Sequence, residues 1–509
     1  MNLGVRRTSI LAAGILALLA SPAAKAQTAG RDTPGALELK TSDQALAAAF
    51  EWARGQALAC AFSGDPVGLW YEAALPGREA FCMRDVSHQA MGAHMLGLAA
   101  HTRNMLHKFA AAVSDSRDWC SFWEINRYDR PAPVDYRNDA EFWYNLPANF
   151  DVLDCCYRMY LWSGDRSYLD DPAFVNFYRR TVEDYARRWD LEPERIMSRQ
   201  RILNVRGRPD PQNRFQTNRG IPSYEESRRD FTVAADLLAA EYAGYLAYAR
   251  IQQLRGHDDE AAKSLAKAEK VKALLNGAWW DPEHPAYYSY VSFEGKLREP
   301  AANAALLYYG ATERGEKTRA TVDGLVRRVE TRPPGIEGQS HLPEILYRYG
   351  MWDAAYRQIL DIASPQKPRR EYPEASYAVV GAIAAGLMGI GVEPAQPSEA
   401  LTWDLYVDRS ISTLPRLTPQ TLWAELDHVP VRNNRVRVRH DGLKKTVLVN
   451  EGGPALFWKA CLPGSLGNLL VDGHPAAAEQ TAADGGRKEV SCVRVAVGAG
   501  ESRTVAAPE

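Results

Sequence analysis

The stretch SYEESRRDFTVAADLLAAEYAGYLAYA, residues 223–249, decides the fold class. From Phe231 onward, apolar residues recur every three or four positions, at Phe231, Ala235, Leu238, Tyr242, Tyr245 and Ala249. Side chains at that spacing lie on one face of an α-helix. We therefore predict a buried helix that begins at Phe231 and is preceded by the acidic pair Glu225–Glu226.

Similar helical periodicity covers most of the chain from Ser42 to about Pro394. It predicts further helices over residues 44–57, 88–108, 147–162, 171–188, 259–276, 298–311, 316–330, 342–364 and 374–391. Short polar connections alternate with long connections that are rich in aromatic, charged and proline residues, such as 112–146 and 189–226. Helical hairpins arranged in a ring would bring the long connections together at one end, where they would line a cleft.

The sequence pattern changes after Pro397. Within 430–509 the side-chain types alternate, and Asp-Gly and Gly-Gly pairs mark turns, which predicts antiparallel β-structure. A short hairpin is also expected over 277–292. The fold class is therefore predicted as mainly α, with a toroid of helical hairpins over 42–397 that carries the site and a small antiparallel β-rich module over 398–509.

The first residues indicate export. Two arginines, Arg6 and Arg7, precede the apolar run ILAAGILALLA, and a small-residue cleavage site follows at Ala24–Ala26. This is the pattern of a signal peptide over 1–26, and the apolar run is too short to cross a bilayer. Residues 27–41 are expected to be a flexible leader. We therefore expect a periplasmic or secreted protein without a membrane span.

Charge and cysteine content narrow the classes of partner and cofactor. The formal net charge of −2 gives no reason to expect nucleic acid or a membrane surface as a partner. Seven cysteines leave at least one thiol free, and Cys461 and Cys492 could pair within the C-terminal module. The chain has no C-x-x-C pair, and His94 with His101 is a weak metal-binding spacing. No metal and no cofactor are predicted.

Polar residues concentrate in four stretches ahead of apolar helices. The first, REAFCMRDVSHQAMGAHM, contains Arg84, Asp85 and His88. A carboxylate beside a guanidinium can hold vicinal sugar hydroxyls through charge-assisted hydrogen bonds. The alternative is an ordinary helix cap with an ion pair.

The second stretch, RNDAEFWYNLPANFDVLD, offers aromatic faces at Trp143 and Tyr144 beside the short polar side chains of Asn145, Asn149 and Asp151. Sugars have an apolar C–H face and polar edges, so this mixture suits sugar binding. Asn145 could equally be only a cap before the proline that opens the next helix.

The remaining two stretches contain glutamates. Glu225 and Glu226 precede the first helix described above, and Glu374 follows Tyr372 in RREYPEASY. A competing site is GIEGQSHLPE, with Glu337 and His341. Tyr372, Glu226, Glu337 and His341 are expected substrate contacts. Each glutamate could instead be an acidic residue that complements a helix dipole.

Together these residues resemble the six-hairpin glycosidases, the (α/α)₆ superfamily that includes glucoamylases and α-L-rhamnosidases. In YEESRRDFTVAA, Tyr224, Glu225, Glu226 and the Phe-Thr pair keep the order of the glucoamylase acid loop. The resemblance implies that Glu225 is the general acid, that Glu226 lies near the first subsite, that Arg84–Asp85 binds sugar and that Glu374 is the general base. Tyr224 replaces the tryptophan context of that loop.

The expected activity is inverting hydrolysis of a glycosidic bond, with the pKa of Glu225 raised by partial burial. Arg228 and Arg229 suggest a substrate that contains uronic acid. Two alternatives stay open. A polysaccharide lyase would use Tyr224, His88 or His341 in β-elimination, and a non-catalytic sugar-binding protein would leave its oligosaccharide intact.

Overall fold

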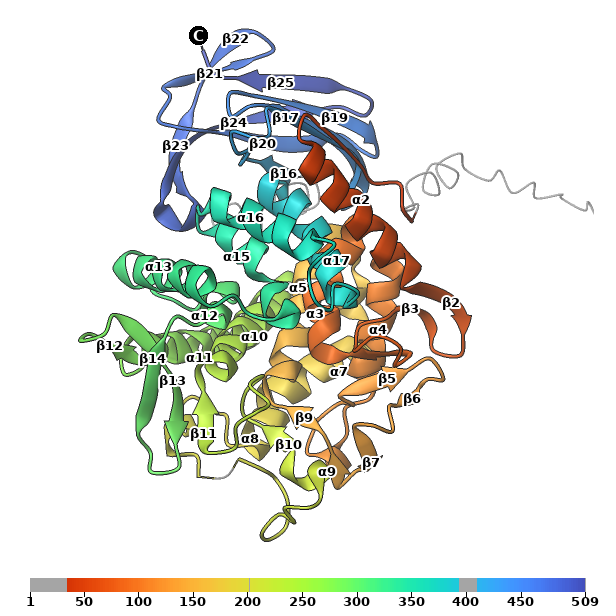
Figure 1. Cartoon of the computed structure of the whole chain (residues 1–509), viewed down its shortest axis with the longest axis vertical. Helices are drawn as coiled ribbons and strands as arrows, with labels where there is room; N and C mark the ends of the chain where they lie inside the picture. Colours follow the sequence, from red (N-terminus) through yellow and green to blue (C-terminus); the bar gives the residue numbers. More distant parts are fainter. Residues whose placement is uncertain (1–33, 201, 393–409, 509) are drawn as a thin grey trace, which may run out of the picture. The chain divides into compact units, whose positions relative to one another are not determined.

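The computed structural model describes residues 34–200, 202–392 and 410–508 of the chain. The predicted signal peptide and the predicted domain boundary near Pro397 lie outside the described residues. The chain from Asp32 to Glu509 forms one compact unit, in which helices dominate the first two thirds and strands the last third (Figure 1).

The helices follow the apolar periodicity of the sequence. Their bounds are α2 Gln44–Ala59, α3 Met83–Met95, α4 Ala99–Ala111, α5 Pro147–Ser163, α6 Ser167–Asp170, α7 Pro172–Arg180, α8 Ala186–Arg188, α9 Arg214–Thr217, α10 Ala235–Leu254, α11 Asp258–Asn276, α12 Ala304–Tyr308, α13 Glu316–Thr331, α14 Ile336–Gln339, α15 Leu342–Arg348, α16 Trp352–Ala363 and α17 Pro373–Gly381. Single π-helical turns, Thr181–Tyr185 and Ala382–Leu387, continue α7 and α17.

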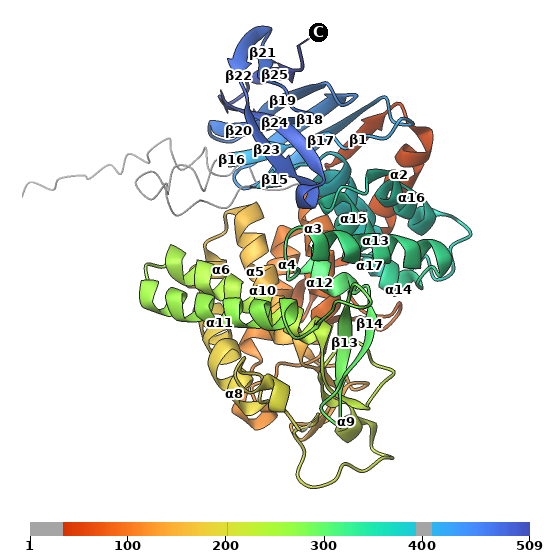
Figure 2. The same ribbon diagram turned by 90° about the vertical axis from the view of Figure 1, so that its left-hand side faces the viewer.

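Six helices pack against one another in chain order. α3 packs against α5, α5 against α10, α10 against α12, α12 against α15, α15 against α17, and α17 returns to α3. Other helices cover this set: α4 packs on α3, α11 on α10, α13 on α12, α16 on α15 and α2 on α17 (Figures 1 and 2). The packing of α17 on α3 therefore brings the polar first turns of these two helices close to each other.

Short strands lie in the long connections. They are β2 Ala61–Asp65, β3 Gly68–Tyr71, β4 Ala80–Cys82, β5 Glu124–Asn126, β6 Arg130–Pro131, β7 Tyr136–Asn138, β8 Glu141–Phe142, β9 Tyr144–Asn145, β10 Arg219–Ile221, β11 Phe231–Ala234, β12 Trp280–Asp281, β13 Ala286–Ser292 and β14 Leu297–Ala301. β9 and β10 pair in parallel, which joins the two long connections 112–146 and 189–226 beside the site. The expected hairpin over 277–292 is present as β12–β13.

The C-terminal strands form two sheets. The strands are β15 Gly391–Val392, β16 Ser410–Thr413, β17 Trp423–Val431, β18 Asn434–Asp441, β19 Lys445–Gly452, β20 Leu456–Pro463, β21 Asn468–Val471, β22 His474–Ala477, β23 Glu479–Ala483, β24 Lys488–Val497 and β25 Ser502–Ala506. One sheet begins with β1, Glu38–Thr41, and has the order β1-β17-β18-β19-β25-β21-β22; the other has the order β15-β16-β20-β24-β23. All neighbours are antiparallel except β16 and β20.

Three segments differ from the sequence prediction. Phe231–Ala234 is strand β11 rather than the start of a helix, because its backbone pairs with β13 across Val233 and Val291. The helix predicted over 88–108 is two helices, since Gly97 has a φ of 77°, a left-handed conformation that ends α3. Glu38–Thr41, expected in the flexible leader, is strand β1 and pairs with β17.

Two further predicted helices are shorter than expected. The segment 342–364 is divided into α15 and α16. In the segment 298–311, the first residues belong to β14 and pair with β13, so that only Ala304–Tyr308 is helical. The break between α15 and α16 contains Gly350, whose φ of 77° is left-handed, whereas the start of α12 is set by the pairing of β14 with β13.

The contact between α3 and α17 depends on Gly92. A Cβ added at Gly92 would lie 2.0 Å from the backbone oxygen of Tyr377. We predict that Gly92→Ala lowers the free energy of unfolding by about 1–3 kcal/mol through overpacking and also lowers activity. Chemical denaturation measures the first effect and a turnover assay the second.

The matched control is Gly55→Ala in α2, where nothing lies within 4 Å of the added Cβ. Replacing this exposed-side glycine in a helix should raise stability by up to about 1 kcal/mol. Equal effects of the two variants would contradict the role given to Gly92.

A disulfide joins Cys461 in β20 to Cys492 in β24, as the sequence allowed, and closes a loop with a sequence separation of 31. The free cysteines are Cys60, Cys82, Cys120, Cys155 and Cys156.

We predict that the double variant Cys461→Ala/Cys492→Ala is less stable by about 3–4 kcal/mol, because without the disulfide the unfolded chain gains loop-closure entropy. Urea denaturation with and without a reductant checks this, because reductant should weaken the wild type and leave the double variant unchanged.

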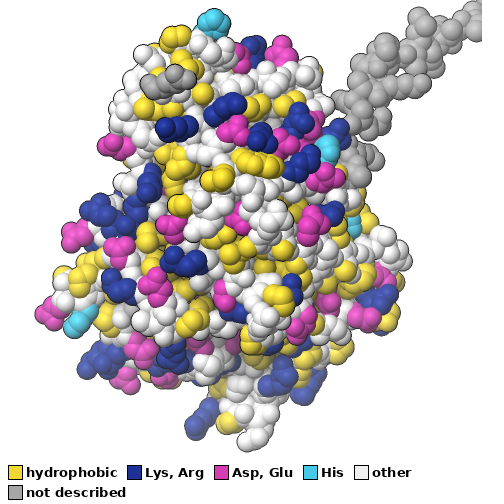
Figure 3. All heavy atoms as spheres, turned by 45° about the horizontal axis from the view of Figure 1, so that its top comes forward, with side chains coloured by type: hydrophobic (Ala, Val, Ile, Leu, Met, Phe, Trp, Pro, Cys, Tyr) yellow, Lys and Arg dark blue, Asp and Glu magenta, His cyan; other side chains and the backbone are white. Residues whose placement is uncertain are grey.

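One face of the molecule carries charges of both signs side by side. On the face drawn in Figure 3, lysine and arginine side chains are interspersed with aspartate and glutamate, in keeping with the formal net charge of −2. Among the described residues, no helix combines the length and the apolar character needed to cross a bilayer.

Candidate active site

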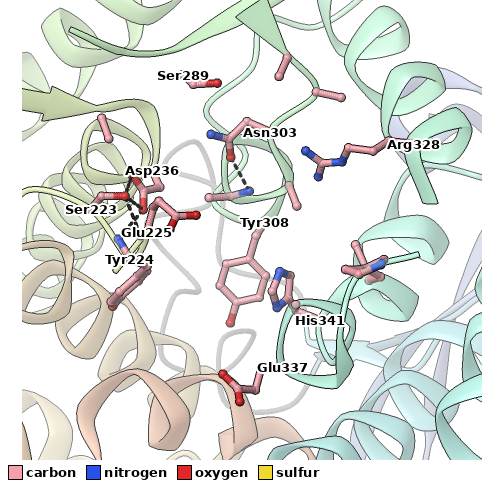
Figure 4. A pocket seen from close by; sticks show the side chains of 18 of the residues that line it. Ser223, Tyr224, Glu225, Asp236, Ser289, Asn303, Tyr308, Arg328, Glu337 and His341 are labelled. Carbon is pink, nitrogen blue, oxygen red and sulfur yellow. Dashed lines mark hydrogen bonds between the residues drawn. The ribbon is translucent and has the colours of Figure 1, made fainter. Parts of the chain in front are cut away.

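A pocket of about 960 Å³ lies among the helices and long connections. Its walls come from α3, the loop ahead of β11, the hairpin β13–β14, α12, the end of α13 and the segment 333–342. All the lining residues lie between Arg84 and Leu342, so the C-terminal module supplies none of these walls. Figure 4 shows Tyr308 and His341 side by side in the pocket, with Glu225 directed toward them from the opposite wall.

Glu374 lies in the first turn of α17 and is 2% exposed. Pro373 opens this helix, and a carboxylate at a helix N-terminus is favoured by the dipole. Ser340 donates a hydrogen bond of 2.6 Å to Oε1 of Glu374, and Nδ1 of His88 lies 3.3 Å from the same oxygen. Burial raises the pKa of Glu374, while the charge of Arg84 and the hydrogen bond from Ser340 partly offset this rise.

His88 links Glu374 to a second buried carboxylate. Its Nε2 lies 3.5 Å from Oδ2 of Asp151, and the hydroxyl of Tyr224 donates to the same oxygen at 2.8 Å. The ring of His88 also meets the edge of Tyr308, with 5.1 Å between the ring centroids. Burial lowers the pKa of His88, so the imidazole is neutral near pH 7.

Arg84 and Asp85 occupy the first turn of α3 rather than a loop. Nε of Arg84 donates to Oδ1 of Asp85 at 3.1 Å, and Nη1 lies 3.9 Å from Oε1 of Glu226. Burial raises the pKa of Asp85 to about 6, although Arg84 opposes this shift. Arg84 lines the pocket beside His88, whereas Asp85 is buried behind it.

The loop that carries the two glutamates is held by Asp236 at the start of α10. Asp236 accepts hydrogen bonds from the Ser223 hydroxyl at 2.9 Å and from the Tyr224 N–H at 2.6 Å. Beyond this anchor, Glu225 projects into the pocket and Glu226 turns toward Asn145, which donates to it at 3.3 Å. Adjacent glutamates therefore have different surroundings.

The partial burial expected at Glu225 is not found. Glu225 is exposed in the pocket, and its Oε1 accepts hydrogen bonds from the N–H of Ser227 at 2.9 Å and from the Ser227 hydroxyl. Burial instead affects Glu226, where it raises the pKa and Arg84 opposes the shift. The sequence prediction was wrong on this point because Glu225 lies on the irregular loop before β11, where its side chain is exposed in the open pocket.

Two predicted substrate contacts belong to the core. Tyr144 and Asn149 are both fully buried. The Tyr144 hydroxyl donates to the Asn149 side chain, whose Nδ2 donates to the Trp119 carbonyl oxygen at 3.1 Å. These side chains fix the path of the connection 112–146 and are not accessible to a ligand. Trp143 is half-buried, and its Nε1 donates to Asn145 at 2.7 Å.

Glu337 and His341 both line the pocket. Glu337 forms an ion pair of 2.6 Å with Arg369, and His341 lies beside His88, with 5.6 Å between their ring centroids. Tyr372 is 2% exposed and occupies the N-cap position of α17, two residues before Glu374. These three predicted residues are thus gathered around the first turn of α17.

The two arginines that suggested an acidic substrate are engaged by protein groups. Arg228 is bonded to Asp230, to Glu299 at 2.9 Å and to the Tyr290 hydroxyl. Arg229 donates to the backbone oxygens of Thr217 and Glu226 and to Asn218. The two arginines therefore stabilise the loop before β11 through these ion pairs and hydrogen bonds.

Three residues at the site were not singled out from the sequence. They are Tyr308, Ser340 and Asp236. Asp236 carried a usable signal, as an acidic residue in the first turn of an otherwise apolar helix. Tyr308 and Ser340 carried none, because the packing of α12 on α10 and α15 brings Tyr308 to the pocket, and the packing of α14 and α15 on α17 brings Ser340 to Glu374.

No model of a known protein family matches the sequence, and no curated protein matches it either. Solved structures do match. An α-L-rhamnosidase from Dictyoglumus thermophilum is 13% identical, with a TM-score of 0.60 over 94% of this chain and 50% of that chain. An α-L-rhamnosidase from Aspergillus terreus is 14% identical, with a TM-score of 0.55 over 92% of this chain and 51% of that chain.

A rhamnosidase of family GH78 from Bacillus sp. GL1 is also similar, at 14% identity and a TM-score of 0.51 over 82% of this chain and 40% of that chain. The chain thus spans about half the length of the rhamnosidases that it matches, and at these identities the likeness concerns the fold. The resemblance to six-hairpin glycosidases that the sequence motifs indicated is confirmed at the level of the fold: the chain shares its architecture with α-L-rhamnosidases.

Proposed function

We propose that this chain is an exported glycoside hydrolase that cleaves a glycosidic bond in an oligo- or polysaccharide with inversion. The observation that carries the proposal is the pair of carboxylates at the pocket. Glu225 faces the open cavity, and Glu374 lies next to His88, which lines it. Inverting glycosidases use one carboxyl group as acid and a second, on the other face of the sugar, as base.

Glu225 is the proton donor. A general acid must first be within reach of the glycosidic oxygen, and its pKa is the second criterion. Glu225 meets the first criterion because its carboxylate is directed into the pocket. Glu226 is hydrogen-bonded to Asn145 and faces Arg84, so it binds substrate near the first subsite.

Glu374 is the base that deprotonates the attacking water. Ser340 and His88 hold Oε1, Tyr372 adds a further hydrogen bond to the carboxylate, and Oε2 would take the proton of the water. In the complex with substrate, the two carboxyl groups should be about 6.5–9.5 Å apart, the spacing that leaves room for a water molecule. Arg84 and Asp85 bind sugar hydroxyls, and the ring of Tyr308 supplies a face for the apolar side of the sugar.

The architecture of the helices agrees with this proposal. The six helices α3, α5, α10, α12, α15 and α17, which pack in a closed series, would be the inner ring of an (α/α)₆ toroid. The outer ring would be α2, α4, α7, α11, α13 and α16. Arg84, Asp85, His88 and Glu374 then come from the same end of two neighbouring inner helices, α3 and α17.

A uronic-acid sugar stays a prediction about the substrate, and Arg328 is the cation that suits it. Figure 4 shows its guanidinium directed into the pocket. Among the described residues it has no hydrogen-bond or ion-pair partner, unlike Arg228 and Arg84. A substrate carboxylate would supply one.

A second candidate is a lyase that removes a proton from a uronate by β-elimination. One observation favours it: His88, His341 and Tyr224 all line the pocket, with Arg84 beside them to neutralise a carboxylate. Neutral imidazole and tyrosine are the side chains that such proton transfers use.

One screen separates these functions. The mature protein is incubated with neutral and uronate-containing plant and bacterial glycans, and products are followed by chromatography, ultraviolet absorbance and early-time NMR of the anomeric proton. Hydrolysis with inverted configuration supports the proposal. Unsaturated products identify a lyase, and oligosaccharides bound but recovered intact identify a binding protein; either result overturns the hydrolase.

A further inference from the structure

Three potential metal ligands from three elements meet at the inner side of the pocket. They are His88 in α3, His341 at the start of α15, and Glu374 in α17. One ligand atom from each lies within 4.8 Å of the other two. Two imidazoles and one carboxylate are the donor set of many zinc sites in which three protein ligands leave a fourth position open.

The distance between the ligand atoms of His88 and Glu374 matches that expected in a metal site. Bonds of about 2.0–2.2 Å to Zn²⁺ in a tetrahedron place the ligand atoms about 3.3–3.5 Å apart. Nδ1 of His88 and Oε1 of Glu374 are 3.3 Å apart. The third ligand, His341, lines the pocket, and its ligand atom lies within 4.8 Å of the other two, so binding an ion would require a side-chain movement to complete the triangle.

Outer contacts orient the ligands as they do around known metal ions. Metal-bound histidines usually have a carboxylate or carbonyl partner on the other ring nitrogen. In this chain, Asp151 lies 3.5 Å from Nε2 of His88, and Ser340 donates to the Glu374 carboxylate at 2.6 Å. The buried Nδ1 of His341 has no hydrogen-bond partner among the described residues, so it is an available donor atom.

The charges around the cluster also suit a cation. Asp85, Asp151 and Glu374 supply three carboxylates, and two guanidinium groups, those of Arg84 and Arg158, face them. The carboxylates thus outnumber the guanidinium groups around the cluster. A hard cation such as Ca²⁺ or Mg²⁺ would prefer more oxygen ligands, whereas imidazole favours zinc and its neighbours in the transition series.

We propose that His88, His341 and Glu374 bind a divalent transition-metal ion such as Zn²⁺, with Asp151 orienting His88 and the open coordination position facing the pocket. Residue spacing carried no sign of this site, because its ligands lie far apart along the chain. The proposal does not depend on hydrolysis. Because Glu374 is also the base proposed for the hydrolase, metal and hydrolytic water compete for it, and saturating Zn²⁺ inhibits turnover.

The test is direct metal binding. Tag-free protein is treated with a chelator, dialysed, and titrated with Zn²⁺ by calorimetry and with Co²⁺ by visible absorption. The expected result is one ion per chain and the intense visible bands of four-coordinate Co²⁺. His341→Ala should weaken Zn²⁺ binding by at least about 100-fold, and Asp151→Asn, an outer partner, by about 10–100-fold.

The matched control is His284→Ala, because His284 lies outside the pocket with a side chain that is 73% exposed. It should bind Zn²⁺ like the wild type. Circular dichroism and melting temperature establish that each variant is folded, and His341→Gln, of similar size, replaces His341→Ala if that variant unfolds. A wild type that binds no Zn²⁺ below millimolar concentration, or His341 variants that bind as tightly as His284→Ala, would overturn the site.

Activity measurements distinguish a failure of the metal site from a failure of the proposed hydrolase function. Hydrolysis by the chelated protein, together with one bound Zn²⁺ that inhibits, supports both. Hydrolysis without any Zn²⁺ binding removes the metal site and leaves the hydrolase. Zn²⁺ binding in a protein whose turnover requires the ion keeps the site and removes Glu374 as the free base.

Discussion

Replacing Glu374 with Gln should reduce kcat by about 10²–10⁴-fold, the usual contribution of a general base. The glutamine cannot deprotonate water, but its amide oxygen can still accept the hydrogen bond from Ser340. The fold should therefore be kept, with a melting temperature close to that of the wild type. Steady-state kinetics on the substrate found in the glycan screen measures the loss.

The control for this variant is Glu371→Gln, which changes an exposed glutamate just ahead of the same helix. It should retain wild-type kcat. A truncated variant, Glu374→Ala, leaves space for a small anion, and azide should restore turnover by acting as the nucleophile in place of activated water. If Glu374→Gln retains most of the wild-type turnover, Glu374 is not the base.

Replacing Glu225 with Gln should also lower kcat by about 10²–10⁴-fold on a natural glycoside, because the leaving oxygen would no longer be protonated. The loss should shrink sharply on aryl glycosides whose leaving group needs no proton. Glu225 is exposed and bonded only within its own loop, so stability should be unchanged. Parallel assays on the two substrate types measure the difference.

The matched control is the adjacent Glu226→Gln. Glu226 faces Arg84 and Asn145, so its loss should mainly raise KM and should have the same effect on both substrate types. The opposite pattern, with leaving-group dependence in Glu226→Gln and not in Glu225→Gln, would transfer the role of acid to Glu226.

Local pattern was sufficient for the long helices. The predicted segments 147–162, 259–276 and 316–330 agree with α5, α11 and α13 to within a residue or two. In these segments the apolar period and the polar flanks favour a helix, and in α5 the proline at the first position favours the same start. Prediction failed where the backbone found a partner far away, as at β1, whose partner β17 lies near the other end of the chain.

The residues of the candidate site likewise fall into those that could be predicted from the sequence and those that could not. Arg84, Asp85, Glu225 and Glu374 could be found from sequence because each is a polar residue close to the start of a strand or helix of apolar residues. Tyr144 and Asn149 looked similar, yet they hydrogen-bond to each other in the core. Sequence spacing could not distinguish these cases, because the direction of a side chain depends on what packs against its element.

The sequence by itself therefore determined the helical framework, the β-rich C-terminal part and the set of acidic and basic groups available for chemistry. Only the tertiary structure decided which groups act together. His88, His341, Ser340 and Glu374 meet because α3 packs closely on α17 at Gly92, and because the 340–342 turn reaches the same helix end. Periodicity reports the neighbours of a residue along its own helix, whereas a site requires neighbours from several elements, which chain packing alone provides.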